Sequence, residues 1–180
     1  RRPTGGGAII MGEDQLGVAL MLRDWKGPKA PRELMRHFAS ALSEGLLVFG
    51  IKAQFRGKND LEVEGRKIGG LGIHSNASGG YLLHCSLLVD LDVTLMLRAL
   101  NVPIEKLESR QLKSIEARIT TVRRELQSST PMEEVRNKML RAFSSYFSVE
   151  FEQSCYSPKE KKAISEMESS RYLKSFSFSK

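Results

Sequence analysis

The stretch Leu61-Glu62-Val63-Glu64-Gly65-Arg66-Lys67-Ile68-Gly69-Gly70-Leu71-Gly72-Ile73 predicts a β-hairpin. Apolar and acidic residues alternate from 61 to 64, a pattern typical of a strand with one buried face. Gly65 marks a tight turn, after which a glycine-rich strand begins. Glycines inside a strand weaken it and usually mark a close approach of backbone or ligand. Lys67 could therefore hold a phosphate or polarise a carbonyl, and a solvated hairpin lysine is the alternative interpretation.

The remaining patterns divide the chain into a strand-rich first half and a helical second half. Apolar or alternating runs predict strands at 8–11, 16–22, 51–55 and 81–89. Apolar residues recurring every four positions from Leu34 to Leu46 predict a helix, and a short helix is expected at 93–100. The capping signatures Thr130-Pro131-Met132-Glu133 and Ser157-Pro158-Lys159-Glu160 each predict a helix start. The predicted fold class is α+β, with a mixed or antiparallel sheet and flanking helices.

Length and composition predict one soluble domain over residues 1–180. No apolar run is long enough to span a bilayer, and no signal peptide is visible at the start. Two cysteines make neither a disulfide framework nor a metal site, so a cytoplasmic location is expected. The net charge of +7 fits either a solvated helix face or a surface for a nucleotide or an acidic partner. Nucleic-acid binding is not expected, since zinc-finger spacing and an aromatic-rich strand are both absent.

The first ten residues, Arg1-Arg2-Pro3-Thr4-Gly5-Gly6-Gly7-Ala8-Ile9-Ile10, have the composition of an anion-binding loop. Three residues without side chains let backbone N–H groups approach an anion closely. Arg2 adds a planar, permanently charged guanidinium. A carboxylate or phosphate site is predicted there.

Two further segments carry polar residues next to predicted strands. Asn59-Asp60 precedes the hairpin and fits either a turn cap or a contact to a ribose or a metal. His84 and Cys85 are adjacent on one predicted strand, so their side chains should point to opposite faces. They are therefore a poor nucleophile–base pair. Cys85 is expected to be a small buried residue, while His84 fits a satisfied core position and an active-site donor equally well.

Each segment alone is weak evidence, but their order and spacing together resemble the lipoate–protein ligase family. That family belongs to the wider group of biotin and lipoate protein ligases. The stretches that carry the resemblance are Arg1–Ala8, Asn59–Leu61, Gly65–Gly70 and Leu83–Leu88. The similarity continues through 92–106, through 114–122, which looks like the segment that closes the catalytic fold, and through the last helix and 172–178.

The resemblance implies an enzyme that activates lipoate with ATP and Mg²⁺, giving lipoyl-adenylate. The lipoyl group would then pass to a lysine of a lipoyl-acceptor domain, of the E2 or glycine-cleavage H-like kind. Lys67 matches the family's catalytic lysine, and Asp60 matches a residue near nucleotide and magnesium. The other residues that the resemblance assigns to lipoate or nucleotide binding are Arg2, Thr4, Gly5, Gly6, Gly7, Asn59, Gly69, Gly70 and His84.

The sequence also departs from the family pattern. Met11-Gly12 stands where the family usually has His-Asp, and Gly69 replaces a serine of the lysine motif. The family has a further segment before the arginine pair, and some relatives use a small accessory domain. We expect both, where required, to be supplied from outside residues 1–180.

Two alternatives remain open at this point. Octanoyl- or lipoyltransferases of the same fold form a thioester on a cysteine and need no ATP. One class carries that cysteine three residues before the matching histidine, where this chain has Tyr81. Another class carries it upstream of the lysine motif, and this chain has no cysteine before Cys85. The second alternative is a non-catalytic subunit that binds a lipoyl domain.

Overall fold

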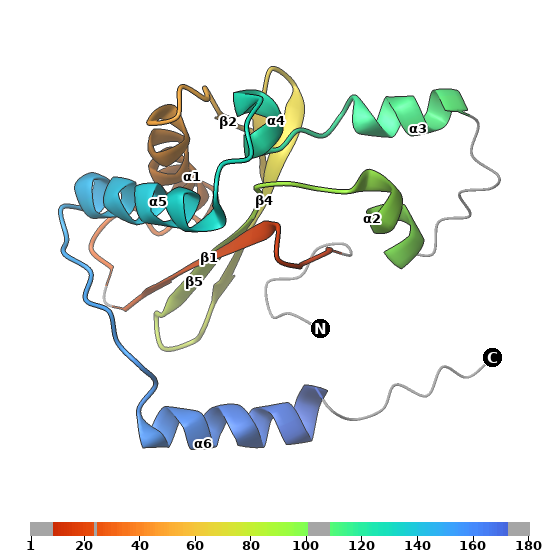
Figure 1. Cartoon of the computed structure of the whole chain (residues 1–180). Helices are drawn as coiled ribbons and strands as arrows, with labels where there is room; N and C mark the ends of the chain where they lie inside the picture. Colours follow the sequence, from red (N-terminus) through yellow and green to blue (C-terminus); the bar gives the residue numbers. More distant parts are fainter. Residues whose placement is uncertain (1–8, 24, 101–108, 173–180) are drawn as a thin grey trace. The chain divides into compact units, whose positions relative to one another are not determined.

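One antiparallel sheet organises this computed structural model, which describes residues 9–23, 25–100 and 109–172 (Figure 1). Its five strands in the described residues lie in the order β1-β5-β4-β3-β2. They are β1 (Gln15–Leu22), β2 (Gln54–Arg56), β3 (Asp60–Val63), β4 (Arg66–Ser75) and β5 (Tyr81–Leu88). The predicted hairpin is β3–β4. Glu64 and Gly65 form its turn with φ of 50° and 77°, as a tight two-residue connection requires.

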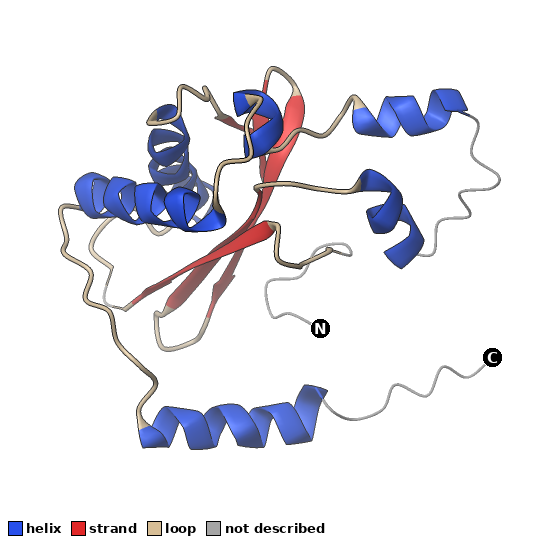
Figure 2. Ribbon diagram, viewed as in Figure 1, coloured by secondary structure: helices blue, strands red, loops and turns tan. Residues whose placement is uncertain are grey.

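The helices lie mainly in the second half of the chain, as predicted (Figure 2). The chain divides into two compact units, and the unit that ends at Val149 holds the sheet and five of the helices. These are α1 (Pro31–Leu47), α2 (Val93–Ala99), α3 (Ser109–Glu116), α4 (Val122–Leu126) and α5 (Met132–Phe147). Together with the sheet they confirm the α+β class. None of the helices in the described part is long and apolar enough to cross a membrane.

The hydrophobic core lies between one face of the sheet and the helices α1 and α5 (Figure 1). The predicted apolar face of α1 is confirmed, because Leu34, Phe38, Leu42 and Leu46 are each at most 1% exposed. Gly45 lets α5 approach, since a Cβ atom there would lie 2.6 Å from the sulfur of Met139. Strand β5 contributes every second residue to this core, through Leu83, Cys85 and Leu87.

A second unit begins at Glu150 and contains α6 (Pro158–Met167) and the π-helical turn η2 (Glu168–Tyr172). The predicted capping box at Ser157 is confirmed. The Ser157 hydroxyl accepts from the Glu160 amide, and the Ser157 amide donates to Glu160 Oε2 at 2.7 Å. The last residues of the family resemblance, 173–178, lie outside the described part. That residues 1–180 form a single domain stays a prediction.

Three local predictions were wrong. Residues 9–11 are not a strand. β2 begins at Gln54 because the Ile51 amide donates to the Leu46 carbonyl at the end of α1 and the Ala53 amide donates to the Ile51 carbonyl. The predicted capping box at Thr130 is absent, and α5 begins at Met132 after Pro131. The Thr130 hydroxyl instead lies 2.8 Å from the Ser128 hydroxyl, within the preceding loop.

Candidate active site

The face of the sheet opposite α1 and α5, here called the open face, carries four of the predicted site residues, which are Lys67, Asp60, Gly70 and His84. Directly paired residues on neighbouring antiparallel strands share a face, so the register defines rows across it. The rows are Met21–Leu82–His74, then Ala19–His84–Gly72, then Gly17–Ser86–Gly70–Asp60. Gly17, Ala19 and Met21 are exposed to solvent. The middle of the open face therefore consists of small residues that surround one histidine, His84.

A β-bulge brings Lys67 onto the open face. Leu61 pairs with Gly69 but Glu62 pairs with Lys67, so β4 carries one extra residue at this point. Ile68 and Gly69 are both buried toward the core. Lys67 and Gly70 consequently share the open face, although an uninterrupted strand would place residues three apart on opposite faces. Bulges of this kind re-aim a side chain beside a functional site.

The Lys67 ammonium lies above Gly70 and forms an ion pair with Asp60. A Cβ atom on Gly70 would lie 3.4 Å from Nζ, so glycine leaves room for the cation. Nζ is 2.6 Å from Asp60 Oδ1, and this buried oxygen accepts no hydrogen bond elsewhere in the described residues. The side chains of Lys67 and Asp60 are 43% and 34% exposed, so the pair remains accessible to a ligand.

Asn59 supports this arrangement from the start of β3. Its carbonyl accepts from the Leu71 amide at 2.7 Å, and its side-chain amide approaches the Leu71 carbonyl at 3.4 Å. These contacts fasten the β2–β3 turn to β4 beside Gly70. In this structure Asn59 therefore joins the turn to β4, a role that the sequence interpretations did not name. A contact to a nucleotide stays a prediction.

The segment before α4 pairs with the backbone of Lys67. The Lys67 amide donates to the Arg118 carbonyl, and the Thr120 amide donates to the Lys67 carbonyl, both at 2.9 Å. Ile119 forms the parallel bridge partner of Lys67. Because β5 pairs with β4 only from Gly69 onward, this segment takes the place of β5 beside the lysine.

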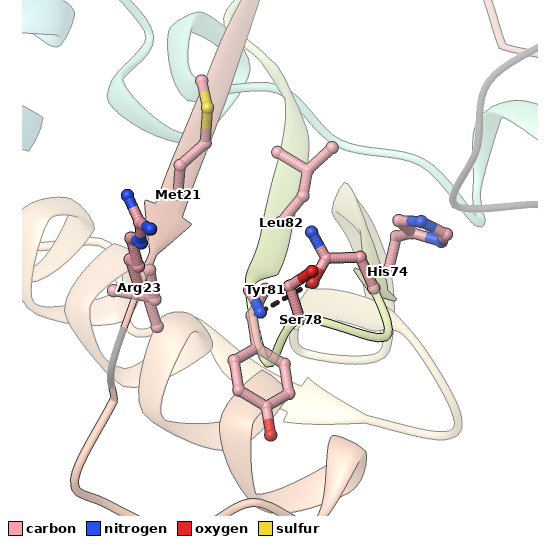
Figure 3. Close-up of a pocket in the computed structure, with 9 residues that line it drawn as sticks. Met21, Arg23, His74, Ser78, Tyr81 and Leu82 are labelled. Atoms are coloured by element: carbon pink, nitrogen blue, oxygen red, sulfur yellow. Dashed lines mark hydrogen bonds between the residues drawn. The ribbon is translucent and has the colours of Figure 1, made fainter.

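A pocket of about 460 Å³ lies at the opposite end of the open face (Figure 3). Met21, Leu82 and His74, which form the first row, lie in its wall. The β4–β5 turn contributes Asn76, whose Oδ1 accepts from the Gly80 amide at 2.8 Å. The complete lining is Met21, Leu22, Arg23, His74, Asn76, Ser78, Gly80, Tyr81 and Leu82. The open face thus joins a cation at one end to a largely apolar pocket at the other.

His84 and Cys85 point to opposite faces, as predicted. His84 is half-buried on the open face, and its ring covers Gly72 so closely that a Cβ atom there would overlap Nε2. Cys85 is 2% exposed on the core face. Burial raises the pKa of the Cys85 thiol from 9.0 to about 12, and the nearby Lys67 charge offsets this only in part. A thiol that stays protonated and faces the core is a poor nucleophile.

The predicted site residues are thus only partly brought together. Lys67, Asp60, Gly70 and His84 share the open face, whereas a side chain at Gly69 would point into the core toward Cys85. The residues Arg2, Thr4, Gly5, Gly6 and Gly7 lie outside the described part of the chain. Met11, which follows them, is described, and its sulfur accepts from the Ser86 hydroxyl at 3.1 Å.

Sequence reasoning did not name Gly72, Ala19 and Met21 as residues of this face. It did predict that Leu82, His84 and Ser86 share one side of a strand, and the register confirms this, but Ser86 was not named as a site residue. The contribution of β1 depends on its pairing with β5, more than sixty residues away in sequence. No local pattern predicts that pairing.

Comparison with known proteins decides the family. A family model described as the lipoyl protein ligase A/B catalytic domain matches residues 1–144. The chain belongs to this family. A probable lipoate-protein ligase A of Mycoplasma pneumoniae is 33% identical over 135 residues, which are 73% of this chain and 38% of that protein. Lipoate-protein ligase A subunit 1 of Thermoplasma acidophilum is 26% identical over 185 residues, covering 96% of this chain and 68% of the relative. Octanoyltransferases named LipM match as well, at 22 to 25% identity.

Solved structures share the fold of this family member. The bi-partite lipoate protein ligase of Thermoplasma acidophilum, studied with its E2 lipoyl domain, superposes with a TM-score of 0.69 at 24% identity. That match covers 88% of this chain and 60% of the other. A lipoate-protein ligase A bound with ATP gives a TM-score of 0.68 at 21% identity, covering 88% and 61%. The present chain spans only 38% of the length of its Mycoplasma relative.

Proposed function

We propose that this chain is the catalytic part of an ATP-dependent lipoate–protein ligase. One observation carries the proposal: the Lys67 ammonium lies over Gly70 at one end of the open face, and a pocket with a largely apolar lining, including Met21 and Leu82, lies at the other. This arrangement suits a substrate with an anionic head and a long apolar tail. Family membership and relatives named lipoate-protein ligase point the same way.

The proposed substrate is lipoate or a medium-chain acid of similar length. Its carboxylate would lie at Lys67, and its chain would cross the small residues Gly17, Ala19 and Gly72. Its far end would enter the pocket beside Met21 and Leu82 (Figure 3). From Ser86 to Leu82 the strand advances about 13 Å, at roughly 3.3 Å per residue, which suits an extended medium-chain acid.

The proposed reaction proceeds in two steps. A carboxylate oxygen of the acid attacks the α-phosphorus of ATP, and pyrophosphate leaves. The Lys67 ammonium stabilises the negative charge that builds on the phosphate and acyl oxygens, and it stays charged throughout. The amine of an acceptor lysine then attacks the acyl carbon, and AMP leaves. We propose that backbone amides of Gly5 to Gly7 bind the phosphates, since that composition suits an anion.

The residues present could hold one magnesium ion only together with the nucleotide. Asp60 Oδ1 is a buried carboxylate oxygen that accepts no hydrogen bond in the described residues, and the Lys67 ammonium is its ionic partner. No group of three or more His, Cys, Asp or Glu side chains that could hold a metal lies within the described part. Magnesium is commonly held by one or two carboxylates plus substrate phosphates. When bound, it would neutralise phosphate charge, with Asp60 as its protein ligand.

The proposed partners are a lipoyl-acceptor domain and, where the activity requires it, an accessory domain. The Thermoplasma ligase of the same fold is bi-partite and was studied with an E2 lipoyl domain. An acceptor of the E2 or glycine-cleavage H-like kind would present its lysine at the Lys67 end of the open face. An accessory domain or further segment would complete the activity where the chain alone does not suffice.

The transferase alternative receives less support from the geometry. A thioester on Cys85 would form on the buried core side of the sheet, on the face opposite the one that carries the Lys67 ammonium. Its thiol also stays protonated at neutral pH. The chain is 22 to 25% identical to octanoyltransferases, but the burial of Cys85 argues against its acting as the cysteine of such an enzyme.

The deciding experiment is detection of the adenylate. The chain is incubated with ATP, Mg²⁺ and lipoate, with and without an added accessory domain, and lipoyl-adenylate is sought by mass spectrometry. Lys67→Gln should abolish its formation, whereas Lys58→Gln, which alters an exposed lysine of the neighbouring turn, should not. Absence of adenylate under every condition would overturn the ligase proposal and favour a non-catalytic subunit. Full activity of Lys67→Gln would remove the assigned role of this lysine.

A further inference from the structure

A largely buried polar cluster lies beside the strand that carries Lys67. Thr120 is fully buried, and its hydroxyl donates to the carboxylate of Glu125. Arg66 lies 3.1 Å from Glu125 Oε1 and 3.3 Å from Oε2. The side chains of Arg66 and Glu125 are 27% and 15% exposed. The Glu125 carboxylate therefore joins a cation and a buried hydroxyl group, and is itself largely buried.

The contacts of this cluster form a closed path that includes the backbone of Lys67. Arg66 directly precedes Lys67 in β4, and the Thr120 amide donates to the Lys67 carbonyl at 2.9 Å. Glu125 joins Arg66 to Thr120 through their side chains. The strand with the lysine and the segment 118–120 are thus held together by two backbone hydrogen bonds and by one shared carboxylate.

We propose that Glu125 is a positioning residue for Lys67, an inference that rests on the proposed role of this lysine. Without the carboxylate, Thr120 and Arg66 lose their common partner and segment 118–120 loosens from β4. The ammonium would then no longer be fixed above Gly70. A misplacement of about 1 Å near reacting groups can cost roughly a hundredfold in rate, so the loss should appear in kcat. Binding of the acid should change less than the rate, because its chain is proposed to contact the rest of the open face.

The test compares variants at Glu125 with a matched control elsewhere. Glu125→Ala removes both contacts, while Glu125→Gln keeps an oxygen that accepts from Thr120. Asp90→Asn is the control. Like Glu125, Asp90 pairs with an arginine, in its case Arg123 of α4 at 3.2 Å, but it does not touch the Lys67 segment. Adenylate formation gives kcat and the KM for lipoate. Hydrogen exchange of the Lys67 and Thr120 amides reports on the pairing without any need for activity.

Glu125→Ala should lower kcat at least tenfold with KM changed less than threefold, and should speed exchange of both amides. Glu125→Gln should restore kcat to within threefold of the unaltered chain, and Asp90→Asn should alter neither readout. Unchanged exchange and kcat in Glu125→Ala would overturn the positioning role, as would equal losses in all three variants. An inactive unaltered chain would instead count against the proposed function, while the exchange rates would still decide whether Glu125 holds the segment beside Lys67.

Discussion

A Cβ atom on Gly69 would lie 3.1 Å from the sulfur of Cys85, so a side chain at position 69 would press on the Cys85 side chain. Gly69 belongs to β4 and Cys85 to β5, and both face the core. The family pattern has serine where this chain has Gly69. Cysteine at 85 is compatible with the sheet spacing because its neighbour has no side chain.

Gly69→Ser should therefore destabilise the chain by about 1–3 kcal/mol, the usual cost of overpacking a core. Cys85→Ala should recover part of that loss, and only part, because the Ser86 carbonyl also lies 3.2 Å from the added Cβ. Denaturant unfolding of both single variants and the double variant measures the coupling. Additive losses would show that the two residues do not compete for the same space.

The sequence was sufficient for the elements whose signals are local. Alternation up to Val63 and the glycine at 65 predicted the hairpin, and the capping residues Ser157 and Glu160 predicted the start of α6. Thr130 carries an equally good capping signature, yet a hydroxyl contact to Ser128 replaces the cap. Competing partners of this kind appear only in the folded chain.

The site was predictable to a smaller extent. Lys67, Asp60 and His84 were identified by residue order and by family resemblance. Lys67 shares a face with Asp60 and His84 only because of the bulge at Ile68, between the pairs Leu61–Gly69 and Glu62–Lys67, and no local residue pattern predicts this bulge. Without the bulge, strict alternation would place Lys67 and Gly70 on opposite sides.

Gly72→Ala should displace the His84 ring from the open face, because the added Cβ would overlap Nε2. A ring can rotate where a backbone cannot, so the free energy of unfolding should fall by less than about 1.5 kcal/mol. NMR shifts of the His84 imidazole should change, and KM for the acid should rise if this ring contacts the substrate. Gly79→Ala is a poor control because φ is 78° there, whereas Ala77→Ser alters the exposed turn without strain. An unmoved ring in Gly72→Ala would contradict the close packing of His84 on Gly72.

Ala19→Leu should act as a block in the middle of the open face. Ala19 is exposed and pairs with His84, so a leucine there adds bulk where the acyl chain is proposed to pass. KM for octanoate and lipoate should rise about tenfold or more, while butanoate, which ends before this row, should be affected less. Ala19→Ser is the matched small variant. Equal effects on short and long acids would contradict the proposed path of the chain.

The two cysteines give a chemical test of the face assignments. Cys155 is exposed and Cys85 is buried with its pKa raised to about 12, so iodoacetamide should alkylate Cys155 first at pH 8. Peptide mass mapping measures both rates in one sample, and Cys155 serves as the internal control. Rapid alkylation of Cys85 in the folded chain would reopen the transferase alternative.

The same thiol should make stability depend on pH in alkaline solution. Its pKa is 9.0 in a solvent-exposed state and about 12 when folded, so between these values the unfolded chain loses the proton that the folded chain keeps. The unfolded state then binds fewer protons, and the free energy of unfolding falls as pH rises from 9 toward 12. Below pH 9 both states keep the proton and this contribution is fully present. Urea unfolding of the unaltered chain and of Cys85→Ala at pH 8, 9 and 10 isolates the effect, because other alkaline groups contribute equally to both. The difference in stability between the two chains should narrow as pH rises, and a constant difference would show that Cys85 ionises as readily in the folded chain as in the unfolded one.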